Sequence, residues 1–235
     1  MTAIRGARER ARREVTAAIK NEARAQLAAE GAAKLSLRAV ARELGMASSA
    51  LYRYFPSRDD LLTALIIDAY DMVGEAAESA LAAAPPSRPP LERWLAVCHA
   101  VREWALAHPH EYALIYGSPI PGYAAPASTV GPASRVALTL IAVIADTHAR
   151  GDLAPPAGSR APDIVTPELT QYTRAMPPEA APALITAWTT LFGLISFELF
   201  GHFHNVVRDP GEFLTRTMTA RAGEVGLPGA GPDTH

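Results

Sequence analysis

The sequence predicts an all-α protein with a small three-helix domain at the N-terminus and a larger helical domain after it. Apolar residues recur at helical spacing along the 235-residue chain, and no stretch of useful length alternates with the period of a strand. The hydrophobic fraction of 49% and the charged fraction of 20% are ordinary for a globular protein with its own core.

Charge is divided unevenly along the chain. Residues 1–60 hold twelve lysine and arginine residues against seven aspartate and glutamate residues, a net charge of +5, and the remainder carries −7. A basic segment on an acidic body is typical of a polyanion-binding module joined to a second function, although chance surface variation gives the same division. The single cysteine forms no internal disulfide, so we expect a reducing compartment, the cytoplasm.

Three helices are predicted in the first sixty residues. Apolar residues recur at spacings of four in Val15, Ile19, Ala23 and Leu27. This stripe predicts a helix of about 20 residues that ends at Gly31. Ser36 is a suitable N-cap for a second helix, whose apolar positions are Leu37, Val40, Ala41 and Leu44. Gly45 supplies a left-handed turn, and a third short helix carries Leu51 and Phe55 before Pro56 ends it.

The remaining elements are long helices separated by proline-rich segments. Ser57 and Asp60 form a capping box that begins a helix over about 58–83. Loops are predicted at 84–90, 118–132 and 154–163. Between and after them we expect helices over about 91–105, 109–117, 133–150, 179–203 and 210–224. The predicted organisation is a first domain over 1–60, a second over 61–226 and a disordered tail over 227–235.

One segment has nearly the length of a membrane span. Residues 180–197 contain no charged side chain over 18 positions. They include Pro182, Gly193 and three threonines, and no basic residue flanks Glu198. We therefore favour a buried core or interface helix, and no membrane, with a membrane helix as the alternative.

The second and third helices, with their glycine turn, favour a helix-turn-helix module for duplex DNA over a simple packed hairpin. A recognition helix is short, begins with small residues and buries one apolar stripe. Residues 47–50 (Ala-Ser-Ser-Ala) supply the small leading edge. Tyr52, Arg53 and Tyr54 offer hydroxyl and guanidinium donors for phosphates or base edges. We expect DNA contact from Arg38 and Arg53, solvent around Arg42, and either packing or contact for Tyr54.

These residues resemble the DNA-binding domain of TetR-family transcriptional regulators. The resemblance is carried by Ser-Leu-Arg-Ala-Val-Ala-Arg-Glu-Leu-Gly at 36–45, Ala-Leu-Tyr-Arg-Tyr-Phe at 50–55 and Pro-Ser-Arg-Asp-Asp-Leu-Leu at 56–62. It implies that Ser48, Ser49 and Tyr52 face the major groove. It further implies that Tyr52, Tyr54 and Arg58 hold phosphates and that Arg38 lies near the DNA backbone. The basic arm from Arg5 to Arg13 is expected to reach towards the minor groove.

Three positions depart from the family pattern. Ala47 stands where Ser or Thr is common, Tyr54 where His is common, and Arg58 where Lys is common. Ala47 cannot cap the third helix, a loss of about 1 kcal/mol unless Ser48 takes over. These changes concern which operator is read, not whether DNA is bound.

The second domain is expected to hold a ligand and a dimer interface. Residues 108–123 and 188–198 are similar to the C-terminal domain described in this family by a Trp-His-Gly signature. Phe192 stands at the histidine position of that signature, so any ligand role of the histidine does not transfer. Our candidates for an apolar or aromatic ligand site are Trp94, Cys98, Tyr112, Tyr116, Trp188 and Phe192, each with a core or interface role as the alternative.

The sequence favours neither a metal site nor a catalytic site. The pairs His108/His110 and His202/His204 have a spacing that places two imidazoles on different helix faces. Ser196, Glu198 and His202 lack a hydrolase motif around them, and we expect Glu198 and His202 to form a plain pair at i, i+4. No metal, no cofactor and no enzymatic activity are expected.

The sequence thus predicts a TetR-like regulator, with a helix-turn-helix domain followed by a helical ligand-binding and dimerisation domain. We expect a repressor that binds a palindromic operator as a homodimer and is released when a small molecule shifts the population of its conformations through the helix at 58–83. The alternative is a DNA-binding protein without a ligand, whose helical body binds a protein partner.

Overall fold

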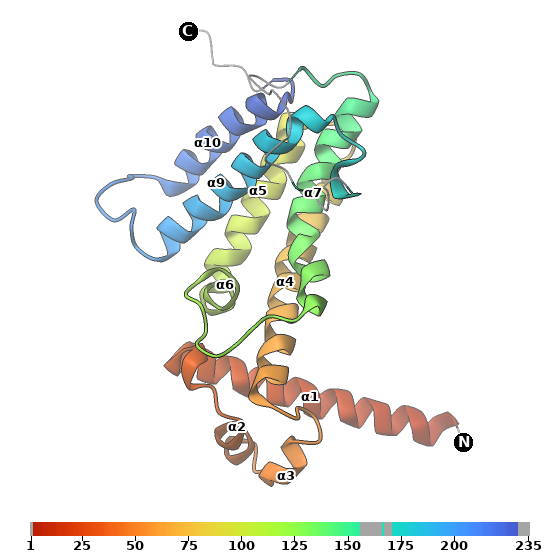
Figure 1. Ribbon diagram of the computed structural model, residues 1–235, viewed down its shortest axis with the longest axis vertical. Helices are drawn as coiled ribbons and strands as arrows, with labels where there is room; N and C mark the ends of the chain where they lie inside the picture. Colours follow the sequence, from red (N-terminus) through yellow and green to blue (C-terminus); the bar gives the residue numbers. More distant parts are fainter. Residues whose placement is uncertain (1, 156–165, 167–170, 230–235) are drawn as a thin grey trace. The chain divides into compact units, whose positions relative to one another are not determined.

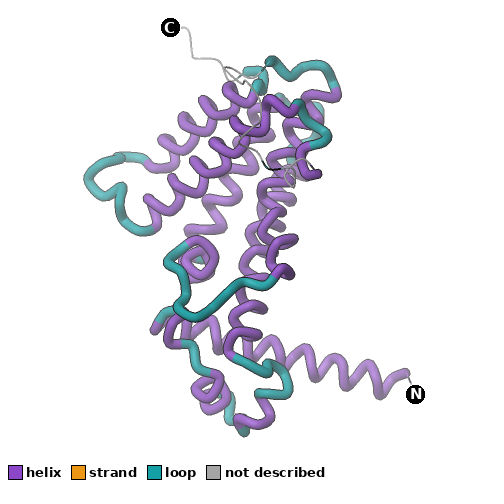
Figure 2. Tube along the Cα trace, viewed as in Figure 1, coloured by secondary structure: helices purple, strands orange, loops and turns teal. Residues whose placement is uncertain are grey.

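The computed structural model describes residues 2–155, 166 and 171–229. Within these residues the protein consists of α-helices joined by loops and short 3-10 turns, and no strand occurs (Figure 1, Figure 2). The predicted all-α class is confirmed.

The chain forms two compact units. The N-terminal unit comprises Met1–Ala69 and His110–Val130, and the C-terminal unit comprises Tyr70–Pro109 and Gly131–His235. The long helix α4 (Arg58–Ala83) begins in the first unit and ends in the second. The chain therefore passes from one unit to the other three times, after Ala69, Pro109 and Val130.

The N-terminal unit contains α1 (Thr2–Glu30), η1 (Ala32–Lys34), α2 (Leu37–Glu43) and α3 (Ser48–Leu51). The predicted stripe is on the core side of α1, where Ile19 and Ala23 are fully buried. Ser36 caps α2 by accepting a hydrogen bond from the Ala39 amide at 3.4 Å. Gly45 has φ 63°, so the left-handed turn after α2 is present as predicted.

The capping box at the start of α4 is also confirmed. The Ser57 hydroxyl accepts from the Asp60 amide at 3.1 Å and donates to the Asp60 carboxylate at 2.7 Å. The first bond satisfies a backbone donor at the helix N-terminus that would otherwise have no partner, and the second links the two side chains. The helix that follows has the bounds predicted from the sequence.

A distant segment completes the core of the N-terminal unit. It contains α6 (Pro109–Tyr116) and the loop after it, with η2 at Ala127–Thr129. Leu114, Ile120 and Tyr123 pack against the core formed by α1 to α4. The Tyr123 and Thr63 hydroxyls are 2.9 Å apart. The first sixty residues therefore do not enclose their core by themselves.

The C-terminal unit contains α5 (Pro90–Ala107), α7 (Val130–Ala149, from its second residue), α9 (Ala181–Leu199, preceded by η3, Pro178–Ala180) and α10 (Pro210–Val225). Helix α10 packs on α9 and α5 (Figure 1). The Trp94 indole N–H, fully buried on α5, donates to the Met218 carbonyl of α10 at 3.1 Å. A buried indole needs such a partner, so this bond fixes one contact between the two helices.

Three arginine residues connect helices of this unit. Arg102 of α5 forms two bonds with the Glu198 carboxylate of α9, at 2.7 and 2.5 Å. Arg135 of α7 binds Glu78 of α4 at 2.6 and 2.9 Å and Asp71 at 2.8 Å. The third is Arg93 of α5, whose buried guanidinium binds Asp146 of α7 at 2.8 Å.

The predicted pair between Glu198 and His202 is wrong. Helix α9 ends at Leu199, and Gly201 has φ 79°, so His202 lies beyond the helix and the i, i+4 geometry is lost. Glu198 binds Arg102 instead, and the His202 ring lies 5.0 Å from the Phe197 ring. Our helix extended too far because its apolar pattern continues through Phe203.

Other differences occur at element ends. Helix α1 has 29 residues and includes the predicted basic arm, since alanine, arginine and glutamate are all good helix formers. Helix α7 begins at Val130 rather than 133. Most of the loop predicted at 154–163 and the tail from 230 lie outside the described residues. Leu227 is buried, because Gly226 ends α10 in a left-handed conformation that turns the chain back.

Candidate nucleic-acid interface

The recognition segment is α3 with the turn that follows it. Ser48 and Ser49 at its start are exposed, whereas Leu51 is fully buried and attaches the helix to the core. After the helix, Tyr52 is 42% exposed and Arg53 is also exposed. The segment therefore presents hydroxyl and guanidinium groups outwards from an anchored backbone, as contact with a DNA groove requires.

The cap of α3 is weak, as Ala47 predicts. Ala47 occupies the N-cap position, and no side-chain hydrogen bond caps the helix there. The helix has only four residues, and its backbone is held chiefly by burial of Leu51 and Phe55. Tertiary packing thus replaces the missing cap.

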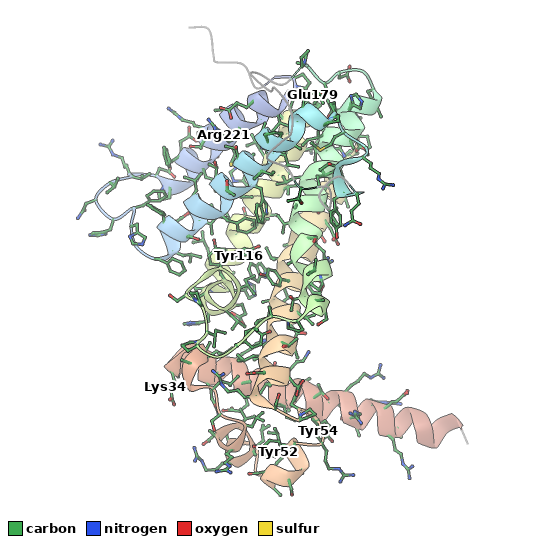
Figure 3. All side chains as sticks on the ribbon, in the orientation of Figure 1. Lys34, Tyr52, Tyr54, Tyr116, Glu179 and Arg221 are labelled. Carbon is green, nitrogen blue, oxygen red and sulfur yellow. The ribbon has the colours of Figure 1, made fainter. Side chains whose placement is uncertain are left out.

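Tyr54 is half-buried and packs against the core of the N-terminal unit. The Arg12 guanidinium carbon of α1 is 5.7 Å from the centroid of its ring, in cation–π contact. Figure 3 shows Tyr54 close to α1 and Tyr52 at the end of α3. Tyr54 is therefore a packing residue, and contact with DNA through its hydroxyl stays a prediction. Arg12 was not among the site residues predicted from the sequence, where its place in the basic arm was the only signal.

Arg58 is engaged inside the protein. Its guanidinium donates to the carbonyls of Ala32, Ala33 and Leu35 at 2.8, 3.3 and 3.2 Å. These carbonyls belong to the connection between α1 and α2, which has few internal bonds of its own. Arg58 therefore ties the start of α4 to that connection, and phosphate binding by its remaining donor capacity stays a prediction.

Other basic side chains near the recognition segment face solvent. Arg38 on α2 and Lys34 on η1 are exposed. Arg42 is 75% exposed and has a loose contact of 3.4 Å with Glu43, consistent with the expected solvent position. Lys20 and Arg24 of α1 each bind the Asp68 carboxylate of α4 at 2.7 Å. Arg38, Arg53 and Lys34 are thus the cations here without a carboxylate partner within the described part of the chain.

Two ligand candidates are core residues of the C-terminal unit. Trp94 and Cys98 are fully buried on α5, and the Trp94 N–H is satisfied by Met218. Burial raises the pKa of the Cys98 thiol far above its ordinary value, so the group is neutral and not a reactive thiolate. A ligand role for either residue stays a prediction.

The other four candidates fall in both units. Trp188 and Phe192 of α9 are in edge-to-face contact, with ring centroids 5.8 Å apart. The buried Trp188 indole nitrogen has no hydrogen-bond partner within the described residues. Tyr112 and Tyr116 of α6 belong to the N-terminal unit, and their ring centroids are 5.1 Å apart (Tyr116 is labelled in Figure 3).

A groove of about 490 Å³ in the C-terminal unit involves different residues. It lies between α4, α5 and α7 and is lined by Leu81, Pro85, Arg93, Leu138 and their neighbours. Within the described part of the chain, no three His, Cys, Asp or Glu side chains gather as a metal site would require. The His108 ring stacks on Trp104 instead, with centroids 5.3 Å apart.

A short exposed helix on a buried helical scaffold, with a glycine turn before it and basic side chains around it, defines a helix-turn-helix DNA-binding protein. Models of known protein families match most of the chain and agree with this class. The model for bacterial regulatory proteins of the tetR family matches residues 19–65, and the model for the tetracyclin repressor-like C-terminal domain matches residues 94–220. The chain belongs to the TetR family of transcriptional regulators.

Individual relatives support the assignment. The chain is 39% identical over 225 residues to the HTH-type transcriptional regulator Rv1816 of Mycobacterium tuberculosis, covering 88% of this chain and 90% of that protein. The crystal structure of SCO4313, a protein described as regulatory, matches with a TM-score of 0.72 at 33% identity, covering 92% and 98% of the two chains. RolR in complex with resorcinol shares the fold at 16% identity, with a TM-score of 0.51 and coverage of 89% and 88%.

These findings confirm three predictions from the sequence. The protein is a DNA-binding transcriptional regulator, and it is a TetR-family member. Because the family and its curated relatives are regulators, the prediction that it is not an enzyme is also confirmed.

Proposed function

We propose that the protein is a cytoplasmic repressor that binds a palindromic operator as a homodimer and leaves it when a small molecule binds. The observation that carries the proposal is the recognition segment, where Ser48, Ser49 and Arg53 are exposed on a backbone anchored by Leu51. Side chains that point away from the core on an anchored helix can form specific contacts with base edges.

Exposed aromatic residues on α9 and after it support a homodimer. Phe197 is 52% exposed and Phe200 is 46% exposed, and Phe213 at the start of α10 is 41% exposed. Apolar surface gathered in this way marks an interface more often than open solvent. A second copy bound through α9 and α10 would cover this surface and place two recognition segments one duplex turn apart, about 34–36 Å.

A membrane is the alternative partner for the exposed apolar side of α9. Two helices, Ala127–Ala149 and Pro178–Leu199, are long and apolar enough to cross a membrane by length and composition, and 39% of each apolar window is buried. Core helices of soluble proteins meet the same criterion. Membership of a regulator family favours the dimer as the partner of the exposed side of α9.

The chemistry around Trp188 supports a small aromatic ligand that carries a hydrogen-bond acceptor. A buried indole N–H without a partner costs about 1–3 kcal/mol, and an acceptor on a bound ligand would remove that cost. Phe192 beside it offers an aromatic wall. RolR, which shares the fold, is known in complex with resorcinol, a ligand of this chemical kind.

Release would follow from a population shift. A ligand that binds one conformation of the dimer better than the other changes operator affinity by the ratio of its two affinities. Helix α4 belongs to both compact units. Its N-terminal part lies in the unit of the recognition segment, and its C-terminal part lies in the unit that would hold the ligand. We infer that the ligand acts on operator binding through this helix.

Selection of bound sequences from a random duplex pool tests the operator part of the proposal. We expect a palindromic sequence with half-sites one turn apart. A selected sequence without two-fold symmetry would contradict the dimeric mode of binding, and recovery of no sequence above background would contradict specific binding altogether.

A double variant tests the dimer. Phe197→Asp with Phe200→Asp places two charges on the exposed surface and should give a monomer by analytical ultracentrifugation. The matched control is Leu106→Asp with Leu138→Asp, which adds the same two charges at exposed apolar positions of α5 and α7, outside the proposed interface. Persistence of a dimer of unchanged stability in the variant of Phe197 and Phe200 would show that the subunits associate elsewhere.

A regulator without a ligand is the second candidate, and the packing of α5 favours it. Trp94 and Cys98 are fully buried, and the groove of the C-terminal unit does not include them. Thermal-shift screening of small phenols decides between the candidates. A compound that raises the melting temperature and weakens operator binding supports ligand release. A panel without any such compound, together with a protein partner that does weaken operator binding, supports the second candidate.

A further inference from the structure

The N-terminal half of α1 extends beyond the core of its unit. We call residues 2–14 the α1 extension. Side chains from Ala7 to Glu14 are all exposed, and contact with the core begins at Val15 and Ile19. In Figure 1 the extension continues past α2 and α3, with no other described element of the N-terminal unit alongside its free end. Most helices in proteins are stabilised by packing of an apolar face on a core. The extension has no such face packed on the core, so burial does not account for its presence.

The extension holds most of the excess positive charge of the first sixty residues. Its five arginine residues and two glutamate residues give +3, whereas residues 15–60 give +2 from seven basic and five acidic residues. Three of those seven are engaged within the protein, since Lys20 and Arg24 bind Asp68 and Arg58 binds backbone carbonyls. The strongest uncompensated positive charge of the unit is therefore on the extension.

One contact places the extension beside the recognition segment. Arg12 lies over the ring of Tyr54, which follows α3 by three residues. The extension thus begins level with the end of the recognition segment and continues beyond it. Thirteen helical residues at about 1.5 Å each reach about 20 Å, which matches about six base pairs at about 3.4 Å per step.

The helical form of the extension changes the expected mode of contact. A helix with its side chains is about 10–12 Å across, whereas the minor groove of B-DNA is about 6 Å wide. The arm expected from the sequence to reach the minor groove is therefore too wide for it in this conformation. A helix with arginines around it suits the phosphate backbone or the neighbouring major groove, which is about 12 Å wide.

We propose that the α1 extension is a second DNA-binding element, which contacts phosphates of the duplex flanking the operator through Arg8, Arg10 and Arg13. The inference rests on the proposed operator binding by the recognition segment and adds to it a sequence-independent contact. We take the partner of the extension to be duplex DNA for two reasons. The positive charge of the extension complements the phosphates, and Arg12 of the extension contacts Tyr54 of the recognition segment. A charged helix that is simply solvated is the outcome that would overturn it.

The test compares two duplexes and three proteins by fluorescence anisotropy at several salt concentrations. One duplex holds the selected operator alone, and the other adds eight base pairs of arbitrary sequence at each end. The variant R8Q/R10Q/R13Q removes three charges and keeps good helix formers in place. The control R88Q/R150Q/R174Q removes three exposed arginines of the C-terminal unit that lie outside α9 and α10, an equal change in net charge.

We expect the unaltered protein to bind the longer duplex at least tenfold more tightly than the shorter one. The R8Q/R10Q/R13Q variant should lose this advantage, and on the longer duplex its log–log salt slope should become shallower by about 2–3 per subunit, as loss of that many phosphate contacts implies. The control variant should behave as the unaltered protein does. Equal binding of both duplexes by the unaltered protein, or an unchanged salt slope in the variant, would overturn the inference.

Failure of the proposed function is distinguishable from failure of this inference. If no operator is selected, the proposed function fails, and the three proteins are then compared on a duplex of arbitrary sequence. A shallower salt slope for R8Q/R10Q/R13Q alone still supports the extension as a phosphate-binding element. Circular dichroism of each variant confirms that helix content is retained.

Discussion

Three arginine residues of the C-terminal unit, Arg93, Arg102 and Arg135, are held by carboxylates on neighbouring helices, whereas Arg38 and Arg53 around the recognition segment of the N-terminal unit face solvent. Arg102 and Arg135 each form bidentate contacts with a glutamate of another helix. Arg38 and Arg53 have no carboxylate partner within the described residues and are exposed. The same side chain therefore fixes helix positions in one unit and remains available to an external anion in the other.

The difference separates stability from binding. A guanidinium held by a carboxylate that is itself partly buried stabilises the fold, and its removal leaves a charge without a partner. An exposed guanidinium adds little to stability and is available to a phosphate. Substitution of the paired arginines should therefore lower stability, and substitution of the exposed ones should weaken DNA binding. Arg58 differs from its neighbours in the N-terminal unit, because it is engaged within the protein.

The largest effect is expected at the ion pair between α5 and α9. Glu198→Ala leaves Arg102, whose side chain is only 19% exposed, without its carboxylate, and should lower the free energy of unfolding by about 2–3 kcal/mol. Urea denaturation measures the change. Glu103→Ala, which removes an exposed carboxylate from α5, the helix of Arg102, is the control and should cost less than about 0.5 kcal/mol. If both variants lost the same free energy of unfolding, the pairing of Glu198 with Arg102 would not contribute specifically to stability.

Arg58 belongs to the N-terminal unit but is engaged within the protein, by backbone carbonyls rather than by a carboxylate of another helix. Arg58→Ala should destabilise the protein by about 2 kcal/mol, because three carbonyls lose a charged donor. Arg58→Lys should recover little, since an ammonium cannot bridge the same carbonyls as a planar fork does. Thermal unfolding and the operator affinity of the folded fraction are measured together. Unchanged stability with weakened DNA binding would make Arg58 a phosphate contact instead.

Arg53 should show the opposite pattern. Arg53→Ala is expected to weaken operator binding about tenfold, equivalent to about 1.4 kcal/mol, with unfolding free energy changed by less than about 0.5 kcal/mol. Anisotropy titration and denaturation measure the two quantities. Arg42→Ala is the matched control, because Arg42 is 75% exposed and faces solvent. If both variants bind as the unaltered protein does, the recognition segment does not read DNA through this side chain.

The smallest effect concerns pH. Hydrogen bonds from Arg135 lower the pKa of Glu78 in the folded protein below its ordinary value. A depressed carboxyl pKa contributes stability that is present above the unfolded pKa of about 4.3 and is lost as pH falls through the folded value. The contribution is small, because the Glu78 side chain is 47% exposed. Between pH 6 and 3 the free energy of unfolding should therefore fall slightly less steeply for Glu78→Gln than for the unaltered protein. Identical pH dependence of the two proteins would contradict the linkage.

Local signals in the sequence predicted most of the helices and the recognition segment. Ser36, Gly45 and the pair Ser57 and Asp60 act within a few residues of their positions, so their roles follow from capping and turn chemistry. The exposed leading edge of α3 followed from small residues beside a buried leucine. These features are local, and a single sequence is sufficient to find them.

Long-range partners were beyond the same reasoning. Arg58 meets carbonyls more than twenty residues away, and Arg102 meets Glu198 across 96 positions. Nothing in the sequence near Glu198 favours Arg102 over the closer His202. The packing of Ile120 and Tyr123 on the core of the first helices likewise depends on the path of the whole chain. Helix periodicity shows which face is apolar, but not which other face covers it.

The three passages of the chain between the compact units affect how this regulator can be rebuilt. The sequence alone would place a single cut between the two domains near residue 60. A cut there would separate the recognition module from Leu114, Ile120 and Tyr123, which complete its core. A chimera that is to recognise a new promoter should therefore exchange residues 110–130 together with 1–69, as one interrupted insert.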